Sequence, residues 1–248
     1  MKLLSVPLAR IVWSFDVSEI NPRGKNIFSD LVPTLIEAYG FKKYPEEGGD
    51  FSKGMVFGLG TFTNHNNDEV QVGLTVWSDG IAADTYSNTN DSDEFMEGLI
   101  EILPQEGYVF ERVMIQRKAY NSHVIVRCEK HLSSLNPRLD EFSKKLSAAI
   151  NPRLMFEPAG IEFWPNQEAK VANFSFQRKT GADFSDNRYW SQAALRTDKH
   201  LELLQDLENI LSKEDVSITS EDSPQYGRTR RIQANPALTG RHPVRPSD

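Results

Sequence analysis

Four charged residues of this chain could support hydrolytic or nuclease-type chemistry. Asp84 and Asp183 each follow a turn within similar stretches of sequence, so an internal duplication would place the two carboxylates at equivalent positions. Glu168 and Lys170 form a Glu-x-Lys pattern at the expected start of a strand. The alternative for Asp84 and Asp183 is that each carboxylate caps local backbone N–H groups after its turn. The four residues are our candidates for a carboxylate-based catalytic site.

The chain offers little for metal or cofactor binding. Cys128 and His131 have a Cys-x-x-His spacing, with His123 nearby, but a zinc site normally needs a second pair of ligands and the neighbouring sequence supplies none. Gly58-Leu59-Gly60 lacks the third glycine of a dinucleotide-binding fingerprint. We therefore predict no metal and no cofactor, and we interpret Cys128 as a buried structural cysteine.

Three aromatic residues are candidates for contacting a partner. Trp77 falls on the polar face of its expected strand if Val76 points inward, and Tyr189 and Trp190 lie in a polar segment later in the chain. Tryptophan and tyrosine are favoured anchors of protein interfaces. The alternative is that neighbouring loops cover all three rings.

The C-terminal segment 216–248 differs in composition from the rest. It lacks an apolar stripe and is rich in proline, glycine and arginine, so we expect it to be disordered when free. Its arginines are Arg228, Arg230, Arg231, Arg241 and Arg245. Of 28 basic and 35 acidic residues in the chain, the tail holds five and three, which leaves 23 and 32 in the remainder, a net charge of −9. The tail could bind nucleic acid, an acidic surface of a partner or of this chain, or nothing specific.

Charge and hydropathy limit the classes of function. The net charge is −7, opposite in sign to that of a typical non-specific nucleic-acid binder. Pro7 and Arg10 interrupt the apolar N-terminal run, so we predict no signal peptide. No stretch approaches the ~18 continuous apolar residues of a membrane helix. The single cysteine fits a reducing compartment. We expect a cytoplasmic protein with no membrane partner.

The first half of the chain predicts an alternation of strands and helices. Ser78-Asp79-Gly80 follows an alternating strand and is typical of a hairpin turn, since Asp-Gly tolerates positive φ. Asp91 can cap the next helix, with Glu94 as its capping-box partner. The expected elements are a central strand over Leu8–Val17, a helix ending at Gly40, strands over Met55–Phe62, Val70–Val76 and Ile81–Tyr86, and a helix ending before Pro104.

The second half predicts a similar succession. Strands are expected over Tyr108–Lys118 and Ser122–Lys130, joined by a turn at Tyr120-Asn121. Asn136-Pro137 marks the start of a helix whose buried stripe would contain Leu139, Phe142, Leu146, Ala149 and Ile150. Strands then follow at Ile161–Trp164 and around Phe174, with a turn at Lys179-Thr180-Gly181 and a return strand beginning at Ala182. A helix after Thr197 carries apolar residues at Leu203, Leu204, Leu207, Ile210 and Leu211.

We therefore predict an α+β fold of two similar strand, helix, strands, helix halves over 1–107 and 108–215, with helices packed on one face of an antiparallel sheet and the tail at 216–248. This layout is similar to the TATA-binding-protein-like repeat, and that resemblance implies two halves joined in one saddle. A pair of ferredoxin-like domains is the rival arrangement. A homodimer that closes the sheet edges is also compatible with the pattern.

The function most consistent with these features is a non-catalytic module that binds another protein, such as an immunity or antitoxin-type inhibitor or an accessory subunit of a larger complex. The absence of familiar catalytic motifs, the acidic body and the tail all favour it. One alternative is a nucleic-acid-processing or hydrolytic enzyme that uses the carboxylates above. Another is nucleic-acid binding through the arginine-containing tail.

Overall fold

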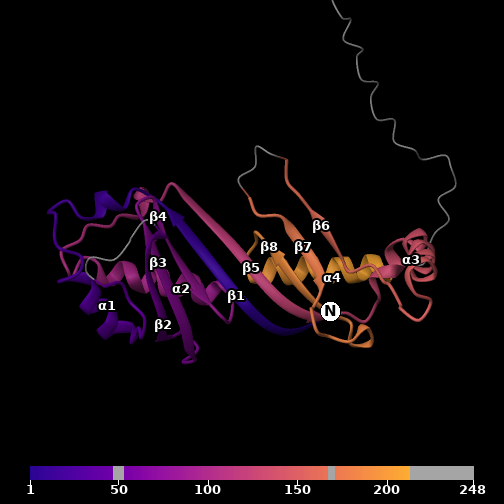
Figure 1. Ribbon diagram of the computed structural model, residues 1–248. Helices are drawn as coiled ribbons and strands as arrows, with labels where there is room; N and C mark the ends of the chain where they lie inside the picture. Colours follow the sequence, from indigo (N-terminus) through magenta and orange to yellow (C-terminus); the bar gives the residue numbers. More distant parts are fainter. Residues whose placement is uncertain (47–52, 167–170, 213–248) are drawn as a thin grey trace, which may run out of the picture. The chain divides into compact units, whose positions relative to one another are not determined.

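The computed structural model describes residues 1–46, 53–166 and 171–212 (Figure 1). Residues 1–213 form one compact unit. Within the described ranges this unit is of the α+β class, with an eight-stranded antiparallel sheet and four α-helices. No helix in these ranges has the length and apolar character needed to cross a bilayer.

The elements follow the same order twice along the chain. The first series is β1 (Lys2–Ser14), α1 (Leu31–Tyr39), β2 (Met55–Thr63), β3 (Glu69–Trp77), β4 (Gly80–Thr85) and α2 (Thr89–Ile102). The second is β5 (Arg117–Arg127), α3 (Pro137–Ile150), β6 (Gly160–Phe163), β7 (Phe174–Arg178), β8 (Arg188–Ala193) and α4 (Thr197–Leu211). Short 3₁₀ helices lie at Val17–Ile20 (η1), Arg112–Met114 (η3), Leu132–Leu135 (η4) and Phe184–Asp186 (η5).

The strand order is β2-β3-β4-β1-β5-β8-β7-β6, so the first strands of the two series meet at the centre of the sheet. The register is centred on Ala9 and Ser122, which face each other across β1 and β5. Ala9 also pairs with Thr85 on β4, and Ser122 pairs with Ala193 on β8. The pairing on one side of the centre is therefore repeated on the other.

The hairpin predicted at Ser78-Asp79-Gly80 is confirmed, because β3 ends at Trp77 and β4 begins at Gly80. Its two-residue loop is Ser78-Asp79 and not Asp79-Gly80, since Trp77 and Gly80 pair with each other. The cap predicted at Asp91 is wrong. Helix α2 begins at Thr89, and the Asn88 side chain accepts hydrogen bonds from the backbone N–H groups of Asn90 and Asp91. Asp91 instead lies in the first turn, where its carboxylate accepts hydrogen bonds from Asn64 and Asn88. A carboxylate in that position satisfies polar groups around the helix N-terminus.

The turn predicted at Tyr120-Asn121 does not exist. Strand β5 runs unbroken from Arg117 to Arg127, and Tyr120 and Asn121 pair with Ile11 and Arg10 of β1. Ladder hydrogen bonds to the long central strand outweigh the local turn preference of asparagine, which is weak beside such non-local pairing. The strand predicted over Tyr108–Lys118 is correspondingly wrong, since most of that stretch is loop and η3.

Two further expectations in the second half are wrong. The return strand β8 begins at Arg188 and not at Ala182, because the connection from β7 includes η5. Helix α3 forms where Asn136-Pro137 predicted it, with Asn136 accepting from the N–H of Arg138. Its apolar stripe is not buried, however, and Phe142 is 61% exposed.

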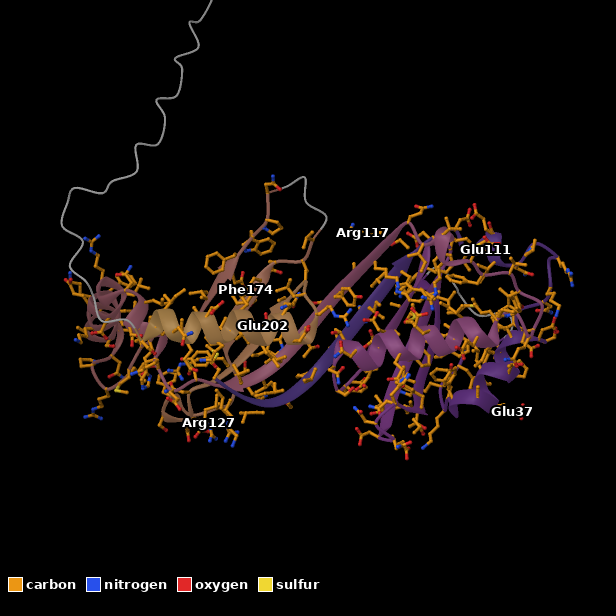
Figure 2. The ribbon with its side chains drawn as sticks, turned by 180° about the vertical axis from the view of Figure 1, so that it is seen from behind. Glu37, Glu111, Arg117, Arg127, Phe174 and Glu202 are labelled. Carbon is orange, nitrogen blue, oxygen red and sulfur yellow. The ribbon has the colours of Figure 1, made fainter. Side chains whose placement is uncertain are left out.

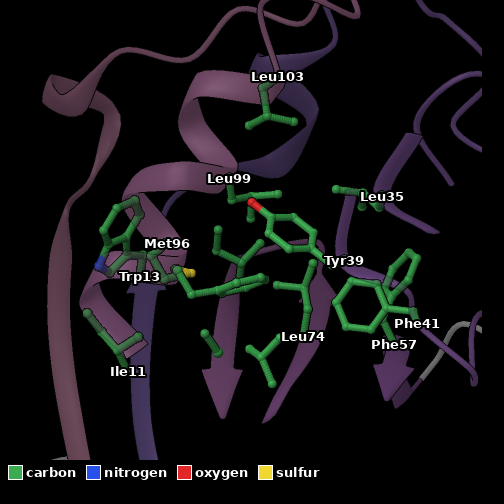
Figure 3. Packing of buried hydrophobic residues seen from close by; sticks show 14 of the residues in the cluster. Ile11, Trp13, Leu35, Tyr39, Phe41, Phe57, Leu74, Met96, Leu99 and Leu103 are labelled. Atoms are coloured by element: carbon green, nitrogen blue, oxygen red, sulfur yellow. The ribbon is translucent and has the colours of Figure 1, made fainter. Parts of the chain in front are cut away.

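Two apolar clusters lie between the sheet and helices α1, α2 and α4. The first joins α1 and α2 to strands β1–β4, with Ile11, Trp13, Leu74, Met96 and Leu99 among its buried members (Figure 3). The second joins α4 to β5, β7 and β8 through residues that include Val124, Phe176, Tyr189 and Leu204. Strand alternation places all these sheet residues on one face, so α1, α2 and α4 cover the same side.

The N-termini of α2 and α4 are joined by a reciprocal pair of hydrogen bonds. The backbone N–H of Thr89 donates to Oγ1 of Thr197 at 3.1 Å, and the N–H of Thr197 donates to Oγ1 of Thr89 at 2.9 Å. Both residues are buried. Each threonine thus satisfies one of the donors that a helix N-terminus leaves without a helical partner.

Replacing Thr197 with valine should lower the free energy of unfolding by about 1 to 2 kcal/mol, because the buried N–H of Thr89 loses its acceptor while the side-chain volume is kept. Urea unfolding of the two proteins measures this change. Thr34→Val, at a partly buried site in α1 whose hydroxyl donates to Asp30 O, is the matched control and should cost less, because it leaves no buried N–H without an acceptor. Equal losses in the two variants would contradict the role given to this junction.

Candidate binding surface

The side of the sheet opposite α1, α2 and α4 forms a separate surface. On β1 the buried Ile11 and Trp13 alternate with the partly exposed Arg10 and Val12, and on β5 the buried Val124 alternates in the same way with its neighbours. We call this side the open face. Its central residues are Arg10, Val12, Asp84, Asn121, His123, Trp190 and Gln192.

An ion pair crosses the open face between β1 and β4. Arg10 and Asp84 are directly opposite in the register, and the guanidinium donates from Nε to Oδ1 at 2.6 Å and from one terminal nitrogen to Oδ2 at 2.7 Å. The hydrogen bond to Asp84 raises the pKa of Arg10. This bidentate geometry fixes both side chains. Asp84 is thereby held as the partner of a cation.

Beside the ion pair, His123 and Trp190 pack against each other. Their ring centroids lie 5.2 Å apart with an interplanar angle of 76°, an edge-to-face arrangement. Burial, and secondarily the charge of Arg10, lowers the pKa of His123, so the ring is neutral near pH 7. Within the described ranges, His123 Nε2 and Asn121 Oδ1 are buried and have no hydrogen-bond partner. Asn121 Oδ1 can accept a hydrogen bond from a bound group, and His123 Nε2 can accept or donate one according to its tautomer.

A hollow of about 360 Å³ opens beside Arg10 and Asn121. It is lined by Arg10, Val12, Arg117, Lys118, Ala119, Tyr120, Asn121, Val171, Ala172 and Ala194. The lining combines small apolar side chains with arginine, lysine and amide groups. A side chain of a bound molecule could enter here and reach Arg10 and Asn121.

Trp77 lies on another part of the open face, at the end of β3, as the sequence predicted. Its ring is partly buried, and its indole N–H donates to the carbonyl oxygen of Lys53 at 3.1 Å. Gly54 lies directly against the indole, because a Cβ built there would be 2.7 Å from Nε1. The loop before β2 therefore holds Trp77 in place.

Tyr189 was predicted to contact a partner, and this prediction is wrong. The side chain is 0% exposed and stacks on Phe176 with centroids 4.4 Å apart. Burial raises the pKa of its hydroxyl. Alternation along β8 sends Tyr189 and Trp190 to opposite faces, so only Trp190 reaches the open face.

The predicted catalytic residues are not brought together. Asp84 lies in β4, whereas Asp183 is exposed in the β7–β8 connection just before η5, so they are not at equivalent positions. The register matches Thr85 with Ala193, and the residue matched with Asp84 is therefore Gln192. Glu168, Lys170, Arg228, Arg230 and Arg231 lie outside the described residues.

Cys128 is buried just beyond β5, which agrees with a structural cysteine, while His131 is exposed. The described part of the chain contains no group of three histidine, cysteine or carboxylate residues placed to bind a metal ion.

Sequence reasoning missed Arg10, Asn121 and His123 as members of this surface. Arg10 stood out only as a charge in an apolar run. An arginine in a central strand was itself a signal, because a charge there needs a partner on a neighbouring strand.

Comparison with known proteins identifies no family. No protein-family model matches the chain, and no curated protein matches it. Among solved structures, TBP of Methanococcus jannaschii is similar over 85% of this chain and 96% of that chain, with 9% sequence identity and a TM-score of 0.37. An identity and a score this low assign neither fold nor function to the present chain.

Proposed function

We propose that this chain is a non-catalytic binding module that holds another protein on the open face of its sheet. The observation that carries the proposal is the make-up of the open face, which presents the Trp190 ring packed on His123 and, separately, a hollow lined by Arg10 and Asn121. Tryptophan and arginine are the residues most enriched at energetic centres of protein interfaces. An inhibitor of the immunity or antitoxin type, or an accessory subunit of a complex, would act in this way.

The charges of the open face support binding more than catalysis. Asp84 is engaged by both nitrogens of the Arg10 fork, which leaves it poorly placed as a general base. Asp183 is remote from it in the topology. An enzyme built on these carboxylates therefore has less support than a binding module.

A specific observation favours nucleic acid as the second candidate partner. Arg117, Arg127 and Arg188 project toward the open face by strand alternation, and Figure 2 labels the first two at the two ends of β5. Acidic residues gather on the covered side, where α2 carries Asp91, Asp93, Glu94, Glu97 and Glu101. The arginines Arg228, Arg230 and Arg231 would add to such binding.

Affinity capture of partners by the full chain, with and without nuclease treatment, tests the proposal. We expect a stoichiometric protein that remains after nuclease treatment. Trp190→Ala should weaken its binding at least about tenfold, and Trp77→Ala should weaken it to a smaller degree, because each removes a large ring from the contact surface. Titration of the identified partner by calorimetry measures both effects.

Val113→Ala is the control, since Val113 is 83% exposed in η3, where its neighbour Arg112 pairs with Glu97 of α2 on the covered side, and it should leave the affinity unchanged. Capture of nucleic acid alone, with a steep salt dependence, would replace the protein partner with the second candidate. A protein partner whose affinity is the same for wild type, Trp77→Ala and Trp190→Ala would overturn the assignment of the open face.

A further inference from the structure

The two halves of the sheet differ in how their second helix is covered. In the first half, α1 packs beside α2, and the ring of Tyr39 lies 4.7 Å from that of Phe95. Phe95 and Leu99 are 1% and 4% exposed, and Ile102 is partly buried against the same cluster. These three residues form one flank of α2, at helical spacing.

The corresponding flank of α4 is uncovered. Residues of α4 lie 108 positions after their α2 counterparts, the spacing between the paired Thr89 and Thr197. Leu203 and Ile210 are therefore the counterparts of Phe95 and Ile102, and they are 42% and 53% exposed. Phe163, on the neighbouring edge strand β6, is 63% exposed.

The helix that corresponds to α1 is α3, and its apolar side is uncovered too. Leu139, Phe142 and Ile150 are 44%, 61% and 59% exposed, and α3 packs beside η4. Figure 1 shows α3 beyond the C-terminal end of α4 and not alongside it. In the first half, α1 and α2 cover each other's apolar sides. The corresponding apolar sides of α3 and α4 are both exposed.

We propose that a second copy of this chain completes the contact, with α3 of each copy packed on the Leu203–Ile210 flank of α4 in the other. A surface that contains both complementary parts generates a closed, twofold-symmetric dimer, because each copy gives and receives the same contact. The proposal concerns a surface distinct from the open face and does not depend on the function assigned there.

The exposed apolar area is sufficient for a dimer. Phe142 and Phe163 are 61% and 63% exposed. Aromatic side chains bury about 150 to 250 Å² each, so these two offer roughly 250 Å². The aliphatic residues Leu139, Ile150, Leu203 and Ile210 raise this to roughly 550 Å². A standard interface buries ~800 Å² per partner, of which about 57% is apolar, so the available apolar area is enough.

The charges of the two helices are also complementary. Helix α3 carries three basic and two acidic side chains, whereas α4 exposes one basic and three acidic side chains, because its fourth acidic residue, Glu208, is buried and pairs with the N-terminal ammonium. Packing α3 of one copy beside α4 of the other therefore brings together surfaces of opposite net charge. Packing α4 against α4 would instead juxtapose acidic surfaces, which favours the reciprocal α3–α4 arrangement.

Light scattering coupled to size-exclusion chromatography, over a concentration series of the full chain, tests the proposal. We expect a dimer that dissociates on dilution. Phe142→Glu and Leu203→Lys should each raise the dimer dissociation constant at least about tenfold, because each places a charge in an apolar contact. Val113→Glu is the matched control, since Val113 is 83% exposed and lies in η3, where its neighbour Met114 packs against the first apolar cluster, and it should leave the dissociation constant unchanged.

Mixing the Phe142→Glu and Leu203→Lys variants distinguishes the reciprocal contact from other dimers. In a mixed dimer, one contact joins the introduced glutamate to the introduced lysine, and the other joins native Phe142 to native Leu203. The mixture should therefore form dimers more tightly than either variant alone. A mixture that stays as monomeric as its components would contradict the α3–α4 pairing.

A double cysteine variant, Phe142→Cys with Leu203→Cys, distinguishes a contact between two copies from a contact within one chain, in which α3 packs on α4 of the same copy. Native Cys128 is buried and should not interfere. We expect a disulfide-linked dimer on a non-reducing gel. An exclusively intramolecular disulfide, or a wild-type chain that is monomeric at every concentration, would overturn the proposal.

Discussion

Replacing Gly80 with alanine is expected to lower the free energy of unfolding by about 3 kcal/mol or more, the largest effect of any small substitution that the structure indicates. Gly80 opens β4 with a φ of +155°, a region that side-chain-bearing residues rarely adopt. A Cβ built at this position would lie 2.3 Å from the carbonyl oxygen of Trp13 and 3.1 Å from Cα of Ser14. The substitution therefore combines backbone strain with a backbone clash.

The clash cannot be relieved by rotating a side chain. Trp13 and Ser14 belong to β1, the strand held on both edges by β4 and β5, and Ser14 pairs with both Gly80 and Arg117. Moving this backbone would disrupt the register at the centre of the sheet. The two costs are each typically 1 to 3 kcal/mol, which gives the expected total of about 3 kcal/mol.

Gly181 provides a matched control for the Gly80 prediction. It also has a positive φ, +79°, but a Cβ built there meets nothing within 4 Å. Gly181→Ala should cost about 1 kcal/mol, which reflects the backbone conformation without a clash. Urea unfolding of both variants measures the difference. If Gly80→Ala were no more destabilising than Gly181→Ala, the close approach of β4 to β1 would not hold.

A second large effect is expected from His200 as the pH falls. This side chain on α4 is 0% exposed, and its Nε2 lies 2.9 Å from Oγ of Ser191, whose hydroxyl donates to the carbonyl oxygen of Ser175. The imidazole therefore donates to Ser191 in its neutral form. Burial, with a smaller contribution from His123, lowers the pKa of His200 to about 4.

The lowered pKa fixes the sign of the pH dependence. The unfolded chain takes up a proton at His200 below pH ~6.5, whereas the folded protein takes it up only near pH 4. The stability linked to this group is fully present above pH ~6.5, is lost as the pH falls through 4, and changes no further below it. At 1.36 kcal/mol per unit, the loss amounts to roughly 3 kcal/mol.

His200→Gln isolates this contribution, because glutamine keeps a donor for Ser191 but does not titrate. The difference in free energy of unfolding between wild type and His200→Gln should shift by roughly 3 kcal/mol between pH 7 and pH 4, against the wild type. Carboxylates titrate alike in both proteins and cancel from the difference. Parallel loss of stability in the two proteins over this interval would show that His200 is not held neutral by burial.

The amino-acid sequence by itself determined the features that depend on neighbouring residues. Ser78-Asp79-Gly80 specified a hairpin because serine, aspartate and glycine favour tight turns, and the apolar spacing from Leu203 to Leu211 specified α4. The apolar run from Leu8 specified a strand that proved central. The succession of strands and helices in the α+β class followed from such local signals.

Only the tertiary structure decided which distant residues meet. Asn121 favours a turn locally, yet it lies within β5 because pairing with Arg10 continues the ladder. The meeting of Arg10 with Asp84, 74 residues apart, depends on the register of the whole sheet. A shift of one residue in that register would send either side chain to the opposite face.

The same reason explains the failures at the candidate site. Asp84 and Asp183 were matched on a few similar residues after turns, whereas the pairing of β4 and β8 with the central strands makes Gln192 the counterpart of Asp84. Amphipathic spacing located the apolar side of α3, but the predicted burial of that side is wrong, because spacing shows only that a helix has an apolar side. What covers that side depends on the elements, or the second copy of the chain, that pack against it.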